Sequence, residues 1–226
     1  MVNLFQYKTL NKVKMEKNEI KIKNQIWMTE NLNVDIFCNG DAIPEARSSQ
    51  EWALAGINKE PAWCFFNNNQ KTAGENTGKL YNWYAVIDPR GLAPKDWHVP
   101  DKTEWFTLLN FLGKKDKYGF WLTETQMKSG YWGEYDDPSN TSGFTALPNG
   151  YRRGTKYKAD QAYYDEYTKF DGFPPFGTND YYAHWWSSSV NENDNPISIE
   201  LRGGKGNVRS YNQMGKEAGL AVRCIR

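Results

Sequence analysis

Cysteine and histidine are scarce in this chain of 226 residues, which contains three cysteines (Cys38, Cys64 and Cys224) and two histidines (His98 and His184). No Cys-x-x-Cys motif occurs, and the two histidines lie far apart in sequence. Because a structural zinc site normally takes four such ligands, we expect no obligatory metal. Three is an odd number, so at most one disulfide can form and at least one thiol stays free. Isolated cysteines are more commonly small buried apolar residues.

The sequence also lacks long apolar runs and an excess of either charge. No run approaches the roughly 20 apolar residues that a membrane-spanning helix needs. Residues 1–19 lack the apolar centre of a signal peptide. The 28 basic and 27 acidic residues are well mixed and give a net charge of +1. We therefore expect no membrane span and no nucleic-acid partner, because no face should attract a phosphate backbone over a long range.

Aromatic residues are abundant instead. The chain has 10 Trp, 14 Tyr and 11 Phe, although its mean hydropathy is only −0.81. The core must therefore be built largely from aromatic side chains. Trp and Tyr also carry a polar tip that needs a partner, which suits half-exposed surfaces and binding sites.

Two helices are expected from local signals. Asp101 can accept hydrogen bonds from the free amides of a first turn, and Glu104 can reach back to it, as in a capping box. The apolar residues that follow at helical spacing are Trp105, Leu108, Leu109 and Leu112, before Gly113. This pattern predicts a helix from Asp101 to Leu112. A second helix is expected over residues 49–56, with Trp52 and Ala55 facing inward.

Strands are expected where apolar and polar residues alternate. The segment 20–28 alternates and turns at Asn24, which indicates a hairpin. The aromatic run 80–87 is strand-like. Further strands are predicted at residues 185–189, 197–202, 206–211 and 220–225. We expect the last of these, around Val222, to pair with the first strand around Ile22.

One boundary is expected near Asn18. Residues 1–18 form a lysine-rich N-terminal extension or docking arm, and residues 19–226 form a single domain. The stretch 130–182 is rich in Gly, Asn, Asp, Pro and Tyr and has little periodicity. Such long irregular segments in a packed domain are usually functional.

Six segments carry a resemblance to a known family. They are NQIWMTENLNV (24–34), GKLYNWYAVID (78–88), RGLAPKDWHVPDKTEW (90–105), SGFTALPNGYRRG (142–154), WWSSS (185–189) and GLAVRCIR (219–226). In this order they resemble the Fibrobacter succinogenes major paralogous domain family. The resemblance implies an α+β, C-type-lectin-like fold, in which two helices flank a twisted antiparallel sheet with long irregular loops. It also implies a relationship to formylglycine-generating and phage-adhesin domains.

The chain departs from the family at one cysteine. Members usually carry a cysteine in the segment that reads GLAPKDWHVP here, where this chain has Ala93. If that cysteine pairs with the one matching Cys224, then Cys224 is unpaired in this chain. A Cys64–Cys224 bridge stays open as an alternative.

Catalysis is not expected. No cysteine pair matches the copper-binding pair of the formylglycine-generating relatives. His184 precedes Ser187, Ser188 and Ser189, but no strand-to-helix elbow surrounds these serines, so a structural role of the hydroxyls is the better interpretation. The acidic residues around Glu134 are typical of a solvated loop.

Binding has better support. Flat aromatic rings, amides and carboxylates suit sugars, while Tyr and Arg concentrate at protein-binding surfaces. The irregular region contributes the candidates Tyr151, Tyr163, Tyr164, Tyr181 and Tyr182. By analogy with the adhesins, a hairpin over residues 201–215 contributes Arg202, Asn207, Arg209, Tyr211, Asn212 and Gln213. We expect no cofactor; calcium is an open alternative at residues 191–195, which offer hard oxygen ligands but lack an EF-hand pattern.

Two functional hypotheses follow. The first is a non-enzymatic, adhesin-like recognition module that binds glycan or protein on a cell surface, or as part of a virion or injection apparatus. The second is a structural assembly subunit whose loops and N-terminal arm contact neighbouring chains. The first places the protein outside the cell, as a lipoprotein-like surface protein, or on a virion.

Overall fold

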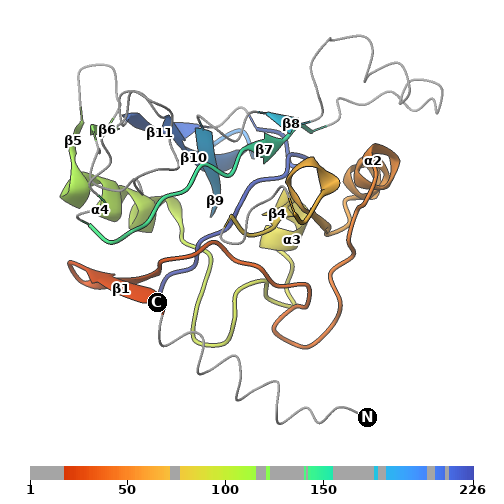
Figure 1. Ribbon diagram of the computed structural model, residues 1–226, viewed down its shortest axis with the longest axis horizontal. Coiled ribbons are helices and arrows are strands. Elements are labelled where there is room, and N and C mark those ends of the chain that lie inside the picture. Colours follow the sequence, from red (N-terminus) through yellow and green to blue (C-terminus); the bar gives the residue numbers. More distant parts are fainter. Residues whose placement is uncertain are drawn as a thin grey trace.

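The computed structural model has an α+β architecture with few helices and short antiparallel strand pairs (Figure 1). It describes residues 18–71, 77–115, 121–122, 140, 142–154, 176–177, 182–202, 207–211 and 214–226. No helix in this described part of the chain is both long enough and apolar enough to cross a membrane.

The main sheet has five strands in the order β5-β6-β11-β10-β9, and its neighbours are antiparallel (Figure 1). Its strands are β5 (Lys114–Lys115), β6 (Trp121–Leu122), β9 (Tyr182–Val190), β10 (Pro196–Arg202) and β11 (Asn207–Tyr211). The predicted strands at 185–189, 197–202 and 206–211 are thus confirmed, with β9 longer than expected. The short pairs are β3 (Trp63–Cys64) with β4 (Leu80–Tyr81), and β7 (Tyr151–Arg152) with β8 (Phe176–Gly177).

The C-terminal residues lie against a hairpin at the start of the described chain. Strands β1 (Glu19–Ile22) and β2 (Gln25–Met28) form the predicted hairpin. The C-terminal residues bond to the other edge of β2, where the Met28 amide donates to the Cys224 carbonyl at 3.1 Å. The prediction that they would pair with the first strand, around Ile22, is therefore wrong, because the hairpin turn places β2 between β1 and the C-terminal segment.

The predicted strand at 220–225 is also corrected. The segment makes isolated bridges to four different partners, at Trp27, Tyr81, His98 and Trp185, rather than one continuous ladder. Its residues are almost completely buried. Buried backbone N–H and C=O groups need hydrogen-bond partners. For this segment the partners belong to separate elements, so no continuous ladder forms.

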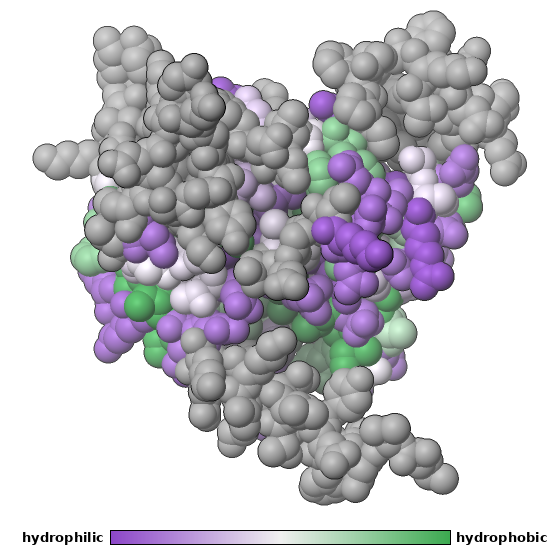
Figure 2. Space-filling model, in the orientation of Figure 1, coloured by the Kyte–Doolittle hydropathy of each residue, from purple (hydrophilic) through white to green (hydrophobic). Residues whose placement is uncertain are grey.

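Both predicted long helices are confirmed. Helix α4 (Lys102–Leu112) begins after Asp101, whose side chain accepts from the Glu104 amide at 2.8 Å while the Glu104 carboxylate accepts from the Asp101 amide at 2.9 Å. Helix α2 (Ser49–Asn58) has the same capping box with Ser48 and Glu51 and runs two residues beyond the expected end. Figure 2 shows that the surface over α2 is mostly hydrophilic.

The aromatic run at 80–87 is only partly a strand. After β4, residues Trp83–Val86 form the one-turn helix α3. Asn82 causes the change, because its side-chain oxygen accepts from the Ala85 amide at 3.0 Å and caps the turn. A short 3-10 helix, η1, covers Phe66–Asn68.

The core contains a cluster of aromatic rings, but most of its buried residues are aliphatic, so it is less aromatic than the composition predicts. Trp27 and Trp105 lie 4.8 Å apart between ring centroids, and Trp83 and Trp186 lie 5.4 Å apart. These four indoles are buried, as is Trp185. Trp97 is only half-buried and lies beneath the Arg226 guanidinium, whose Cζ is 5.0 Å from the ring centroid.

Buried polar groups tie the C-terminal segment to the rest. The Arg223 guanidinium is fully buried and donates to the Asn31 side-chain oxygen at 2.7 Å and to the Phe144 carbonyl. Burial lowers the pKa of Arg223 to about 9. Trp185 donates to the same Asn31 oxygen at 2.8 Å. One amide oxygen thereby joins the sheet, the C-terminal segment and the loop after β2.

All three cysteines are free thiols. Cys38 is exposed, whereas Cys64 and Cys224 are buried. Burial raises the pKa of the Cys64 thiol to about 11 and that of Cys224 to about 12. The Cys64–Cys224 bridge that the sequence left open is absent.

Candidate functional site

The candidate site begins with the register of the two longest strands. His184 of β9 lies directly opposite Glu200 of β10, and Tyr182 lies opposite Arg202. Because directly opposed residues of antiparallel strands share one face of the sheet, the four side chains form two neighbouring pairs. The alternate residues Ala183, Ile199 and Leu201 belong to the opposite, apolar face.

The centre of the site is a buried imidazole–carboxylate pair. The His184 Nε2 and Glu200 Oε2 atoms are 3.8 Å apart, and their side chains are 1% and 5% exposed. The Arg202 Nε donates to the Glu200 Oε1 at 2.7 Å, while its own side chain is 38% exposed. Arg202 thus covers the carboxylate from the solvent side and supplies the opposite charge that a buried carboxylate requires.

Tyr151, on β7, also contacts the His184 ring. The preceding residue, Gly150, pairs with the edge of β9, with its amide donating to the Tyr182 carbonyl at 3.1 Å. The Asn149 side chain accepts from the His184 amide at 2.9 Å. These bonds hold β7 against β9, so that the Tyr151 ring meets the His184 ring edge-on at 4.8 Å.

Glycine is required where β8 passes under Tyr151. A Cβ atom on Gly177 would lie 2.1 Å from the Tyr151 Cε1 atom. Gly150 adopts φ +59°, and a Cβ there would lie 2.4 Å from the Phe66 Cε2 atom. Gly177 in β8 and Gly150, just before β7, therefore approach aromatic rings more closely than a residue with a side chain allows.

Two guanidinium groups complete the site. The Arg202 Cζ lies 5.5 Å from the centroid of the Tyr182 ring, and the Arg153 Cζ lies 5.4 Å from the Tyr151 ring. Both tyrosines and both arginines are half-buried. We call this group the tyrosine–arginine site; it consists of Tyr151, Arg153, Tyr182, His184, Glu200 and Arg202.

The structure brings together three of the predicted site residues, namely Tyr151, Tyr182 and Arg202. The backbone positions of three more lie on β11, where Asn207, Arg209 and Tyr211 are opposite Arg202, Glu200 and Ser198. Tyr163, Tyr164, Tyr181, Asn212 and Gln213 lie outside the described residues. Whether any of these residues binds a partner stays a prediction.

Sequence reasoning missed three members of the site. The sequence pattern associates His184 only with the serines and does not single out Glu200 or Arg153. The usable signal was the alternation in β9 and β10, where Tyr182 and His184, and likewise Glu200 and Arg202, are separated by single apolar residues.

Two of the three serines after His184 accept hydrogen bonds from backbone amides through their hydroxyls. The Ser189 hydroxyl accepts from the Lys102 amide at 3.0 Å, at the start of α4. The Ser187 hydroxyl accepts from the Ser189 amide at 3.2 Å. These bonds fit the structural interpretation of the hydroxyls.

The loop proposed for calcium is internally bonded. The Asn191 side-chain oxygen accepts from the amides of Asn193 and Asn195, at 2.9 and 3.0 Å. Asp194 forms an ion pair with Lys216. Among the residues that the structure describes, no group of three or more His, Cys, Asp or Glu side chains could hold a metal ion.

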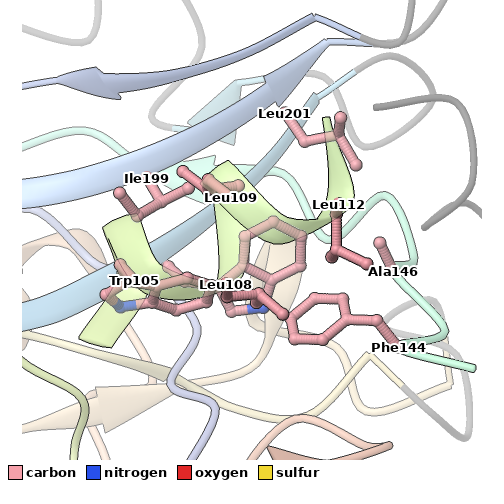
Figure 3. A pocket seen from close by; sticks show the side chains of 9 residues that line it. Trp105, Leu108, Leu109, Leu112, Phe144, Ala146, Ile199 and Leu201 are labelled. Carbon is pink, nitrogen blue, oxygen red and sulfur yellow. The ribbon is translucent and has the colours of Figure 1, made fainter. Parts of the chain in front are cut away.

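A small apolar cavity lies between α4 and the sheet (Figure 3). Its volume is about 20 Å³, enough for roughly one water molecule. The lining includes Trp105, Leu108, Phe144 and Ile199. Because the lining is apolar, we interpret the cavity as imperfect packing of the core rather than a ligand site.

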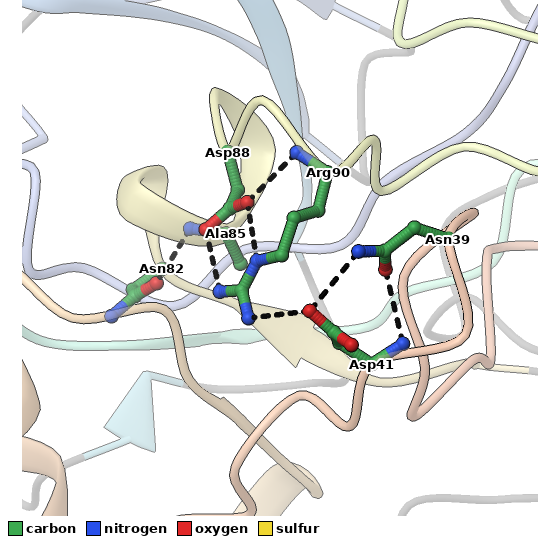
Figure 4. Close-up of polar contacts among 6 residues, drawn as sticks. All are labelled: Asn39, Asp41, Asn82, Ala85, Asp88 and Arg90. Atoms are coloured by element: carbon green, nitrogen blue, oxygen red, sulfur yellow. Dashed lines mark hydrogen bonds and ion pairs between the residues drawn. The ribbon is translucent and has the colours of Figure 1, made fainter.

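A second polar network lies on a surface turn (Figure 4). The Arg90 guanidinium donates to both carboxylate oxygens of Asp88, at 2.8 and 2.9 Å, and to Asp41 at 3.5 Å. It also stacks on the Phe37 ring, 4.2 Å from its centroid. The hydrogen bonds that Arg90 donates lower the pKa of the Asp88 carboxyl group. The network links two loops, and its charged groups bond to one another.

The fold and the site define a class of protein: an α+β domain that holds a buried imidazole–carboxylate pair beneath half-exposed tyrosines and arginines. The chain belongs to the Fibrobacter succinogenes major domain family, whose family model matches residues 20–226. No curated protein and no solved structure matches it.

Proposed function

We propose that the protein is a non-enzymatic, adhesin-like recognition module that holds a glycan or protein partner at the tyrosine–arginine site. The observation that carries the proposal is the buried His184–Glu200 pair with its cover of half-exposed Tyr151, Tyr182 and Arg202. Burying these groups is unfavourable compared with the aromatic packing used in the core of this chain. Buried titratable groups under accessible aromatic residues are more typical of binding sites than of scaffolds.

The scaffold supports this proposal. We infer a C-type-lectin-like arrangement from the two capped helices, the antiparallel sheet and the C-terminal segment bonded to the N-terminal hairpin. In such an arrangement, loops of different shape can be displayed without changing the core. A partner that is met outside the cell, on its surface or as part of a virion, fits this type of module.

A binding role fits the chemistry better than catalysis. The hydroxyls of Ser187 and Ser189 accept hydrogen bonds from backbone amides, and the Glu200 carboxylate accepts one from Arg202. A general base must reach a proton of its substrate, whereas this carboxylate is covered from the solvent side. We therefore assign to His184 and Glu200 the positioning of Tyr182 and Arg202.

The proposal is tested by probing a glycan array and a panel of cell-surface proteins with the purified protein. Tyr151→Ala and Tyr182→Ala should abolish the signal for any ligand of the wild-type protein. Arg209→Ala and Tyr211→Ala test the neighbouring strand β11. Arg47→Ala is a matched control, because the Arg47 side chain is 78% exposed and lies near α2.

The assembly hypothesis is tested with the same variants. If the module functions as a subunit, native mass spectrometry should detect an oligomer that these substitutions, or deletion of residues 1–18, dissociate. If every variant binds the ligand as tightly as the wild-type protein does, the tyrosine–arginine site is not the binding site.

A further inference from the structure

Strand β1 is the outer strand of the N-terminal hairpin and lies at the margin of the described part of the chain (Figure 1). On its other side, β2 is hydrogen-bonded to the C-terminal segment through the amides of Ile26 and Met28. These two residues lie opposite Lys21 and Glu19 of β1. In an antiparallel ladder, opposed residues either bond to each other or both point their backbone groups away. The backbone groups of Glu19 and Lys21 therefore point toward the outer edge of β1.

This edge has no backbone partner among the residues that the structure describes. In that part of the chain, no strand pair, bridge or backbone hydrogen bond joins β1 to an element other than β2. An unpaired strand edge presents N–H and C=O groups to which another strand can add. Charged residues on an edge normally discourage such addition, so the positions of the charges determine which strand can pair with β1.

The sequence of β1 is complementary to itself in the antiparallel direction. Glu19 and Lys21 flank Ile20. When two copies pair about a twofold axis at Ile20, Glu19 of each copy lies opposite Lys21 of the other. Because these are the residues whose backbone groups point toward the open edge, each opposed pair can exchange two hydrogen bonds. Opposite charges directly across a ladder are stabilising, whereas like charges are destabilising.

The side chains of β1 allow this contact. Lys21 is exposed, and Ile20 is half-buried against the core. The Glu19 side chain is 28% exposed, and both of its oxygens accept from the Arg226 Nη2, at 2.8 and 2.9 Å. An ionised carboxylate has about four acceptor positions, so Glu19 can accept from Lys21 of a second copy as well.

We propose that two copies of this chain associate through their β1 strands, about a twofold axis at Ile20, and so join their hairpins into one sheet. A twofold interface requires a surface that is complementary to itself, which the charges of β1 provide. A four-residue edge buries far less than the roughly 1,200 Å² of a stable complex. The dimer is therefore weak and depends on protein concentration. This association is independent of the function proposed above.

The test measures the association constant by sedimentation equilibrium over a range of protein concentrations. Lys21→Glu should reduce the constant at least about tenfold, because both cross-strand pairs change from attraction to repulsion. Glu19→Lys should have the same effect. An equimolar mixture of the two variants should associate again, as a heterodimer, because every cross-strand pair then has opposite charges.

Controls separate the charge from the backbone and from folding. Lys21→Pro removes an amide that points away from β2, so it should abolish the dimer while the hairpin persists. Lys95→Glu makes the same charge change at an exposed position elsewhere and should leave the association constant unchanged. If Glu19→Lys unfolds after losing its bond to Arg226, thermal unfolding identifies this, and the two Lys21 variants carry the test.

Two results would overturn the proposal. One is a wild-type protein that stays monomeric at every concentration. The other is a dimer that both Lys21→Glu and Lys21→Pro leave unchanged, which would place the interface elsewhere. If Tyr151→Ala weakens that dimer, the interface includes the tyrosine–arginine site instead.

Discussion

Replacing Trp105 by alanine should destabilise the protein more than any substitution on its surface. The indole is 1% exposed, lies 4.8 Å from Trp27 and 6.0 Å from Trp185 between ring centroids, and lines the apolar cavity. A buried tryptophan removes roughly 150–250 Å² from water, which corresponds to about 4–6 kcal/mol at about 25 cal/mol per Å². Alanine keeps part of that burial, and comparable substitutions cost about 3–5 kcal/mol. We expect a loss of about 4 kcal/mol.

The assay is urea unfolding followed by circular dichroism. With an m-value of about 3 kcal/mol per M, the midpoint should fall by more than about 1 M. Trp97→Ala is the matched control, because Trp97 is only half-buried, and it should shift the midpoint much less. Since the substitution enlarges an existing apolar cavity, added indole should raise the midpoint of Trp105→Ala but not that of the wild-type protein. A midpoint of Trp105→Ala near that of the wild-type protein would refute the packing described here.

Three further predictions concern local features. A thiol reagent should modify only Cys38 in the native protein but all three cysteines in denaturant. The reason is that Cys64 and Cys224 are buried and that burial raises the pKa values of their thiols. Reaction of two or more thiols in the native state would contradict this. Asp101→Ala should lower the free energy of unfolding by about 1 kcal/mol in the same urea assay, through the loss of the α4 cap; an unchanged midpoint would show that the cap is dispensable. Arg90→Ala should leave the urea midpoint nearly unchanged, because the ion pair is partly exposed. It should nevertheless speed amide exchange in the loop that contains Cys38, and unchanged exchange would show that Arg90 does not hold this loop in place.

Local signals in the sequence were sufficient to predict the long helices and the hairpins. The Asp101–Glu104 capping box and the spacing of Trp105 and Leu108 act within one or two turns, so the sequence contains the whole cause of α4. The β10–β11 hairpin likewise depends on neighbouring alternation. The six ordered segments predicted the family, and the family match over residues 20–226 confirms that prediction.

The remaining features depend on contacts between distant residues. Helix α3 forms because Asn82 caps it, but that side chain is also fixed by the Glu60 carbonyl and the Ala62 amide, which lie about 20 residues away. The C-terminal segment finds its partners on several elements, so its alternation could not predict a ladder. The site combines Tyr151 with His184 and the residue opposite it on β10, and their meeting requires strand pairing that no local pattern specifies.

Ligand-dependent hydroxyl-radical footprinting tests the central claim most directly. It reports the solvent access of individual side chains in the intact protein and therefore needs no substitution that could disturb folding. The half-buried rings of Tyr151 and Tyr182 should be oxidised in the free protein and protected when a glycan identified on the array is bound. Trp97, which is also half-buried but lies beneath Arg226 beside the C-terminus, should be oxidised equally in both states. Protection of Trp97 with unchanged oxidation of both tyrosines would contradict the account and place the ligand away from the tyrosine–arginine site.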